Sequence, residues 1–141
     1  MTSTQNAVAW SAVIGLVPGY NHTSDPEVIA NRRDLLIKQW QKAMDDTLGL
    51  TGYVVSATLT DTKVLYPSEH GGPEGGEAAV TFSGSSNPNF VKPRDFDDFI
   101  EAVKSTVLRV QRGMKQETVR IEFTYIDNSV YSRLDKADMI A

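Results

Sequence analysis

The 141-residue sequence predicts one α+β domain of the ferredoxin-like kind, with elements in the order β-α-β-β-α-β. Two segments, 24–48 and 95–114, carry apolar residues at helical spacing. Segments rich in alternating or β-branched residues precede, separate and follow these two helices. Right-handed crossovers then give a four-stranded antiparallel sheet in the order 4-1-3-2, with both helices on one face.

The first strand and the first helix have clear sequence limits. Residues 8–17 are apolar at nearly every position and end at Pro18-Gly19, which indicates a strand that is buried on at least one face. Ser24 and Glu27 have the spacing of a capping box, so the first helix is expected to begin there. Gly49 occupies the place of a left-handed residue after the last turn, which predicts the end of this helix.

A hairpin with a long tip is expected in the middle of the chain. Residues 51–66 are rich in Val, Thr, Tyr and Leu, and residues 77–83 supply the return strand. Between them, residues 67–76 hold four glycines and two prolines. Loops of this length are often functional, so the tip is a candidate part of a site.

The second helix and the last strand complete the domain. Asp95 is expected to cap a helix whose apolar stripe runs from Phe96 to Met114. Residues 119–125 then alternate apolar and polar side chains, as an amphipathic strand does. The whole chain, 1–141, is expected to be a single domain with flexible termini at 1–7 and 135–141.

Composition excludes several function classes. The net charge is −4, which argues against a nucleic-acid partner, and no apolar stretch is long enough to span a membrane. There are no cysteines, so thiolate catalysis, disulfides and iron–sulfur clusters are excluded. The first residues lack the pattern of a secretion signal, so a cytoplasmic location is expected. No cofactor is expected.

The topology brings several polar residues to one end of the expected sheet. The loop after the first strand and the hairpin tip leave the sheet at the same end, and both histidines of the chain lie on these loops. An arginine within the apolar face of the first helix is either a rim residue of the core or an anion-binding fork. The predicted ligand-binding residues are Tyr20, Asn21, His22, Arg33, Glu69 and His70.

A metal site and a catalytic site receive less support from the sequence. His22 and His70 with Glu69, Glu74 or Glu77 would suit a divalent ion, but no local spacing positions a ligand pair, so no metal site is predicted. None of the tyrosines has a basic neighbour in sequence, and no catalytic residues are assigned. We therefore expect a non-catalytic binding protein; the alternative is a small enzyme of the dimeric α/β-barrel type that uses His or Tyr as acid or base.

The face of the sheet that the helices leave open predicts self-association. Val13 and Val17 are expected on this face, which makes it too apolar for water, and Leu108 lies on the polar side of the second helix. Two sheets paired across a symmetry axis would cover such a face. A homo-oligomer is therefore expected, with a small ligand or a protein partner held at the loop end or in the cleft between subunits.

Overall fold

The computed structural model describes residues 2–17 and 25–140, except for the side chains of residues 2–5, 138 and 140. The elements are β1 (Thr2–Gly15), α1 (Pro26–Thr51), β2 (Thr58–Val64), β3 (Glu77–Ser85), α2 (Phe96–Met114) and β4 (Arg120–Ser132). Three short 3-10 turns follow β2, precede α2 and follow β4: η1 (Ser68–His70), η2 (Pro93–Asp95) and η3 (Lys136–Ile140). No helix in these described segments is long and apolar enough to cross a membrane.

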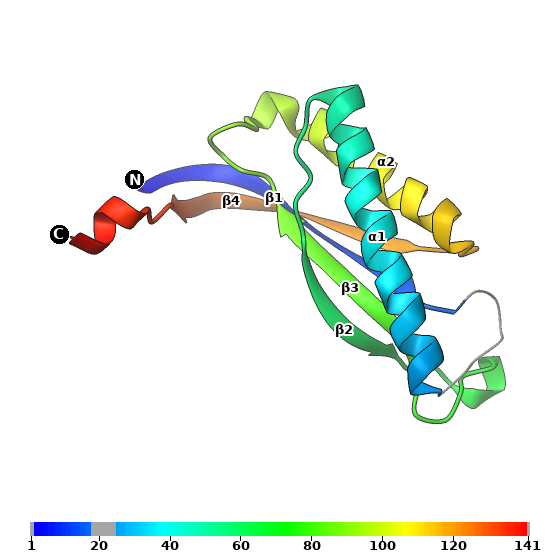
Figure 1. Cartoon of the computed structure of the whole chain (residues 1–141). Helices are drawn as coiled ribbons and strands as arrows, with labels where there is room; N and C mark the ends of the chain where they lie inside the picture. The colour runs from blue at the N-terminus through cyan, green and yellow to red at the C-terminus, as the bar shows by residue number, and fades with distance from the viewer. Residues whose placement is uncertain (1, 18–24, 141) are drawn as a thin grey trace.

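The four strands form one sheet, and every neighbouring pair is antiparallel. The hydrogen-bonded order is β2-β3-β1-β4, which is β4-β1-β3-β2 when read from the other edge. Both helices lie on the same side of this sheet (Figure 1). The prediction of an α+β chain with a four-stranded antiparallel sheet and two helices is confirmed.

The core lies between the helices and one face of the sheet. Alternate residues of β1 point into it, because successive side chains of a strand face opposite ways. Trp40 of α1 stacks between Trp10 of β1 and Phe82 of β3, with ring centroids 5.8 Å and 4.0 Å apart. The remaining fully buried large side chains include Val8, Ile14, Leu36, Val80, Phe99, Val103, Val107 and Val110. These contacts fix α1 and α2 on the sheet.

The first helix differs from its predicted limits at both ends. Asp25 is the N-cap, and its carboxylate accepts a hydrogen bond from the backbone N–H of Glu27 at 3.0 Å. The predicted cap, Ser24, lies outside the described residues. The helix continues through Gly49 and ends at Thr51, because Gly52 adopts the left-handed conformation, with φ 77°, that terminates it. β2 accordingly begins at Thr58 rather than at Thr51.

The strands β1 and β4 are longer than the sequence pattern indicated. Thr2 pairs with Ser132 at the far end of their ladder, and the register shifts between Gln5 and Ala7. Residues 2–7, expected as part of a terminus, thus belong to β1. The two strands extend past the helices as a ribbon (Figure 1). The prediction missed this ribbon because its residues do not alternate strictly between apolar and polar.

The face of the sheet opposite the helices carries mostly hydroxyl side chains. Thr62 and Thr81 share a hydrogen bond of 2.6 Å between their Oγ1 atoms, and Thr58 and Ser83 share one of 3.2 Å. Val13 lies on this face, whereas Val17 packs against the core. The expectation of a strongly apolar open face is therefore wrong: paired Ser and Thr hydroxyls satisfy one another on neighbouring strands.

Candidate functional site

One end of the open sheet face contains a cavity of about 320 Å³. Three parts of the fold meet there: the end of β1, the β2–β3 hairpin and the segment between α2 and β4. The antiparallel pairing produces this meeting, because Gly15 of β1 is opposite Ala79 of β3, and Val64 of β2 is opposite Glu77. The lining residues are Val13, Gly15, Val64, Glu77, Ala79, Gln116, Thr118 and Arg120.

A tyrosine and a carboxylate form a pair at this cavity. Tyr66 follows the last residue of β2 by two positions, and Glu77 is the first residue of β3. The Tyr66 hydroxyl donates a hydrogen bond to Oε2 of Glu77 at 3.3 Å, in a partly buried position. The hairpin register brings the two side chains together across the tip that separates them in sequence. Glu77 thus places a carboxylate at the cavity wall, and the Tyr66 phenol is bonded to that carboxylate.

A glutamine amide is packed beside the end of β1. A Cβ added to Gly15 would lie 3.1 Å from Oε1 of Gln116. The absence of a side chain at Gly15 therefore leaves room for the amide. Nε2 of Gln116 is buried and has no hydrogen-bond partner among the described residues. A buried donor without a partner is unusual in a folded protein. Gln116 therefore offers an N–H donor to a molecule in the cavity.

One arginine joins three segments near the cavity, and a second lines its wall. Nε of Arg32 donates to the carbonyl of Leu16 at 2.7 Å, and its Nη2 donates to the carbonyl of Met114 at 3.3 Å. These bonds join α1 to the ends of β1 and α2. Arg120, at the cavity wall, pairs with Glu122 at 2.7 Å. The sequence analysis did not single out Arg32, because its contacts join segments that are distant in the chain, or Arg120, whose ion pair is with a neighbour on the same strand.

The six predicted ligand-binding residues are divided between three places. Tyr20, Asn21 and His22 lie outside the described residues. Glu69 and His70 are exposed in η1, at the hairpin tip. Arg33 lies on α1, and its Nε bonds to Oδ1 of Asp61 on β2 at 2.7 Å. The described contacts thus join Arg33 to the sheet edge rather than to the hairpin tip.

Metal ligands are not clustered in the described part of the chain. No group of three or more His, Asp or Glu side chains in residues 2–17 and 25–140 could hold a metal ion.

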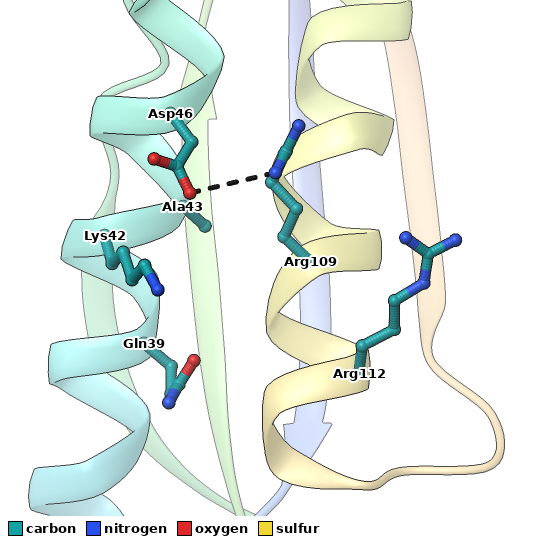
Figure 2. Close-up of a pocket in the computed structure, with 6 residues that line it drawn as sticks. All are labelled: Gln39, Lys42, Ala43, Asp46, Arg109 and Arg112. Atoms are coloured by element: carbon teal, nitrogen blue, oxygen red, sulfur yellow. Dashed lines mark ion pairs between the residues drawn. The ribbon is translucent and has the colours of Figure 1, made fainter.

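Two further cavities lie away from this end of the sheet. One, of about 450 Å³, is lined by Tyr53, Phe90 and neighbouring residues at the opposite end of β3. Desolvation raises the pKa of the Tyr53 phenol, and the carboxylates of Asp95 and Asp98 raise it further. The other, of about 220 Å³, is a polar groove between α1 and α2 (Figure 2).

The comparisons with known proteins define the class of protein. The fold matches two solved structures with a TM-score of 0.53 each: a phage SAM lyase in complex with S-methyl-5'-thioadenosine, and a phage SAM lyase in the apo state. The first is 17% identical, with 90% of each chain covered; the second is 15% identical, with 94% of this chain and 91% of that chain covered. No curated protein matches.

The family follows from the sequence model rather than from the fold. The model of the SAM lyase family matches residues 6–132, which is most of the chain. The chain therefore belongs to the SAM lyase family. This finding overturns the prediction of a non-catalytic binding protein, because the family and both matching structures are enzymes. The prediction failed because no compact catalytic motif marks the sequence.

The Tyr66–Glu77 pair was not predicted as a site. Tyr66 had no partner nearby in sequence, and Glu77 was considered only as a metal ligand. The signal that could have found the pair is the hairpin itself. Two strands joined by a long tip bring the residues at its two ends together, and here these residues are a phenol and a carboxylate.

Proposed function

We propose that this protein cleaves S-adenosylmethionine (SAM) at a carbon–sulfur bond and releases S-methyl-5'-thioadenosine. The family supports the reaction class, and the phage structure with bound S-methyl-5'-thioadenosine supports the product. The observation that supports this location for the reaction is the hydrogen bond from Tyr66 to Glu77, which lines the cavity of about 320 Å³. A cavity with a few convergent polar groups is the default candidate for a ligand-binding site.

The reaction balances without water or a redox partner. The bond between sulfur and the aminobutyryl chain breaks, and sulfur keeps the electron pair and becomes a neutral thioether. The carbon that loses sulfur gains a bond in one of two ways. Either the substrate's own carboxylate oxygen attacks it and closes a lactone, or the neighbouring carbon loses a proton and an alkene forms. The lactone route requires no base from the protein.

Glu77 supplies the negative charge that a sulfonium substrate needs. The positive charge on sulfur is present in the bound substrate and disappears as the bond breaks. A carboxylate beside it therefore interacts more strongly with the substrate than with the transition state. In this proposal Glu77 contributes mainly to binding, and the Tyr66 hydroxyl holds the carboxylate in position through its hydrogen bond.

Gln116 and Arg120 suit the other polar groups of the substrate. The buried Nε2 of Gln116 is a donor without a partner in the described residues, and Arg120 lies at the same wall of the cavity. Both are donors, so they match the carboxylate of the methionine part of SAM. Holding that carboxylate fixes the position of the oxygen that would attack in the lactone route, and positioning of this kind accelerates a ring closure.

The test compares Glu77→Gln with Glu101→Gln, a change of the same kind on the exposed side of α2. Removal of the Glu77 charge is expected to raise KM about tenfold or more, since two opposite charges about 4 Å apart attract by about 1–4 kcal/mol near a protein surface and tenfold corresponds to about 1.4 kcal/mol. kcat is expected to change much less, and Glu101→Gln to change neither constant. A kcat loss of a hundredfold or more at unchanged KM, the usual cost of a lost proton acceptor, would contradict the binding role. Wild-type constants in Glu77→Gln would move the site elsewhere.

The remaining expectations from the sequence stay proposals. The order of elements and the placement of both helices on one face support a ferredoxin-like fold. Self-association is supported by exposed apolar side chains on and after the β4 half of the ribbon, namely Val130, Leu134 and Met139. A cytoplasmic location fits an enzyme that consumes SAM, which cells make in that compartment.

A further inference from the structure

The groove between α1 and α2 lies in the helical layer, away from the proposed SAM cavity on the opposite face of the sheet. It encloses about 220 Å³ and is lined by Gln39, Lys42, Ala43 and Asp46 of α1 and by Arg109 and Arg112 of α2. Figure 2 shows Arg109 extending toward α1, whereas the guanidinium of Arg112 turns away from it. The groove therefore has Arg109 at its centre and exposed cations at its rim.

The groove is positive in a chain whose net charge is −4. The residues that line it include three cations, Lys42, Arg109 and Arg112, and a single carboxylate, that of Asp46. Nη1 of Arg109 is 3.7 Å from Oδ2 of Asp46, which is beyond hydrogen-bond distance. The ion pair is loose, so this carboxylate does not use the hydrogen-bonding capacity of the guanidinium.

Arg109 also has a donor that nothing satisfies among the described residues. Its Nε is buried and has no hydrogen-bond partner there. A buried donor of this kind costs free energy unless a bound group accepts a hydrogen bond from it. The amide of Gln39 adds a second polar group, and it lies so close to Gly113 that any Cβ at that position would collide with it. The absence of a side chain at Gly113 thus leaves room for the Gln39 amide at the groove wall.

We propose that this groove binds a phosphate-type oxyanion. The planar fork of Arg109 matches two oxygens of a phosphate, and the Lys42 ammonium adds a point charge from the facing helix. The Gln39 amide can donate a third hydrogen bond. Asp46 opposes binding, because its carboxylate lies next to the anion. This site does not rest on the proposed SAM chemistry, and it would persist if that proposal failed.

The test is a titration of the full chain with inorganic phosphate, with chloride added to keep ionic strength constant. Backbone amide NMR shifts are expected to saturate and to concentrate on 39–46 of α1 and 109–113 of α2. Arg109→Lys keeps the charge and removes the fork, and we expect affinity to fall about tenfold. Lys42→Gln is expected to weaken binding severalfold, whereas Lys104→Gln, an exposed lysine of α2 outside the groove, leaves it unchanged.

Asp46→Asn gives a change of the opposite sign. Removal of the competing carboxylate is expected to tighten phosphate binding severalfold, a result that no loss of folding can imitate. Glycerol phosphate in a parallel titration distinguishes the source: a monoester that binds as well as phosphate indicates a phosphate-ester ligand, and preference for free phosphate indicates the inorganic ion. Amide shifts that do not saturate or that spread over the whole surface would overturn the proposal. So would a phosphate affinity that is the same in the wild type, Arg109→Lys and Asp46→Asn.

Discussion

The buried contact between the two helices allows a stability prediction with a defined direction. The Oγ1 atoms of Thr47 and Thr106 are 2.7 Å apart, and both residues are fully buried. The Thr106 hydroxyl also donates a hydrogen bond to the carbonyl oxygen of Ala102 at 3.0 Å. A hydroxyl has a single proton, so Thr106 cannot donate to Thr47 as well. Thr47 is therefore the donor in the contact with Thr106. Replacement of either threonine by Ala removes the contact, but only Thr106→Ala leaves the proton of the Thr47 hydroxyl without an acceptor.

The two single variants share most of their energetic terms. Each loses a buried methyl group, at about 0.8 kcal/mol, and each gains helix propensity of up to about 0.7 kcal/mol. Thr106→Ala also leaves the Thr47 donor unpaired, which costs about 1–3 kcal/mol. Thr47→Ala leaves Thr106 bonded to Ala102, so it loses only one net hydrogen bond, about 0.5–1.5 kcal/mol. Thr106→Ala should therefore be the more destabilising change, by about 1 kcal/mol.

Urea unfolding of the two single variants and the double variant measures these terms. A difference of 1 kcal/mol moves the midpoint by roughly 0.3–1 M, given slopes of about 1–3 kcal/mol/M. The double variant should lose about 0.5–1.5 kcal/mol less free energy of unfolding than the sum of the two single variants, because each single variant already removes the shared hydrogen bond. Equal losses in the singles would show that Thr47 finds another acceptor, such as the carbonyl four residues earlier, and additive losses would refute the contact itself.

Three further predictions concern packing, pH and assembly. Gly84→Ala should cost about 1–3 kcal/mol in thermal or urea melts, because its Cβ would lie 2.6 Å from the Ser56 carbonyl oxygen and 3.1 Å from the Trp10 ring; an unchanged melt would contradict this packing. The raised pKa of Tyr53 means that the unfolded phenol ionises first, near 10.0, so stability should fall as pH rises above that value. Tyr53→Phe should reduce this fall, and identical pH curves would argue against the shift. Sedimentation should show a homo-oligomer at micromolar concentration, and a 15.5 kDa monomer would refute self-association.

The regular elements were predictable where one periodicity dominated the sequence. The apolar stripe from Phe96 to Met114 has the same limits as α2. A left-handed glycine ends α1, as predicted, but it is Gly52 rather than Gly49. Local patterns were insufficient where tertiary pairing extended an element. The outer halves of β1 and β4 stabilise each other as a ribbon, and neither half has a strong strand pattern alone.

The site was less predictable than the fold because its residues come from separate segments. The sequence correctly drew attention to the long hairpin, but it favoured the histidine at the tip over the residues at the base. Tyr66 and Glu77 become neighbours only through the register of β2 and β3. Gln116 becomes notable only because its amide is buried against Gly15, a contact between β1 and the segment that joins α2 to β4.

The central claim, that the chain cleaves SAM without water or a redox partner, is tested most directly by proton NMR of SAM incubated with the purified protein and a metal chelator. S-methyl-5'-thioadenosine and a four-carbon product should appear in equal amounts as SAM disappears. The second product should be the lactone, because no base is required to form it, and Glu77→Gln should slow its appearance at low SAM concentration. Intact SAM after prolonged incubation, or a methylated acceptor without S-methyl-5'-thioadenosine, would contradict the account.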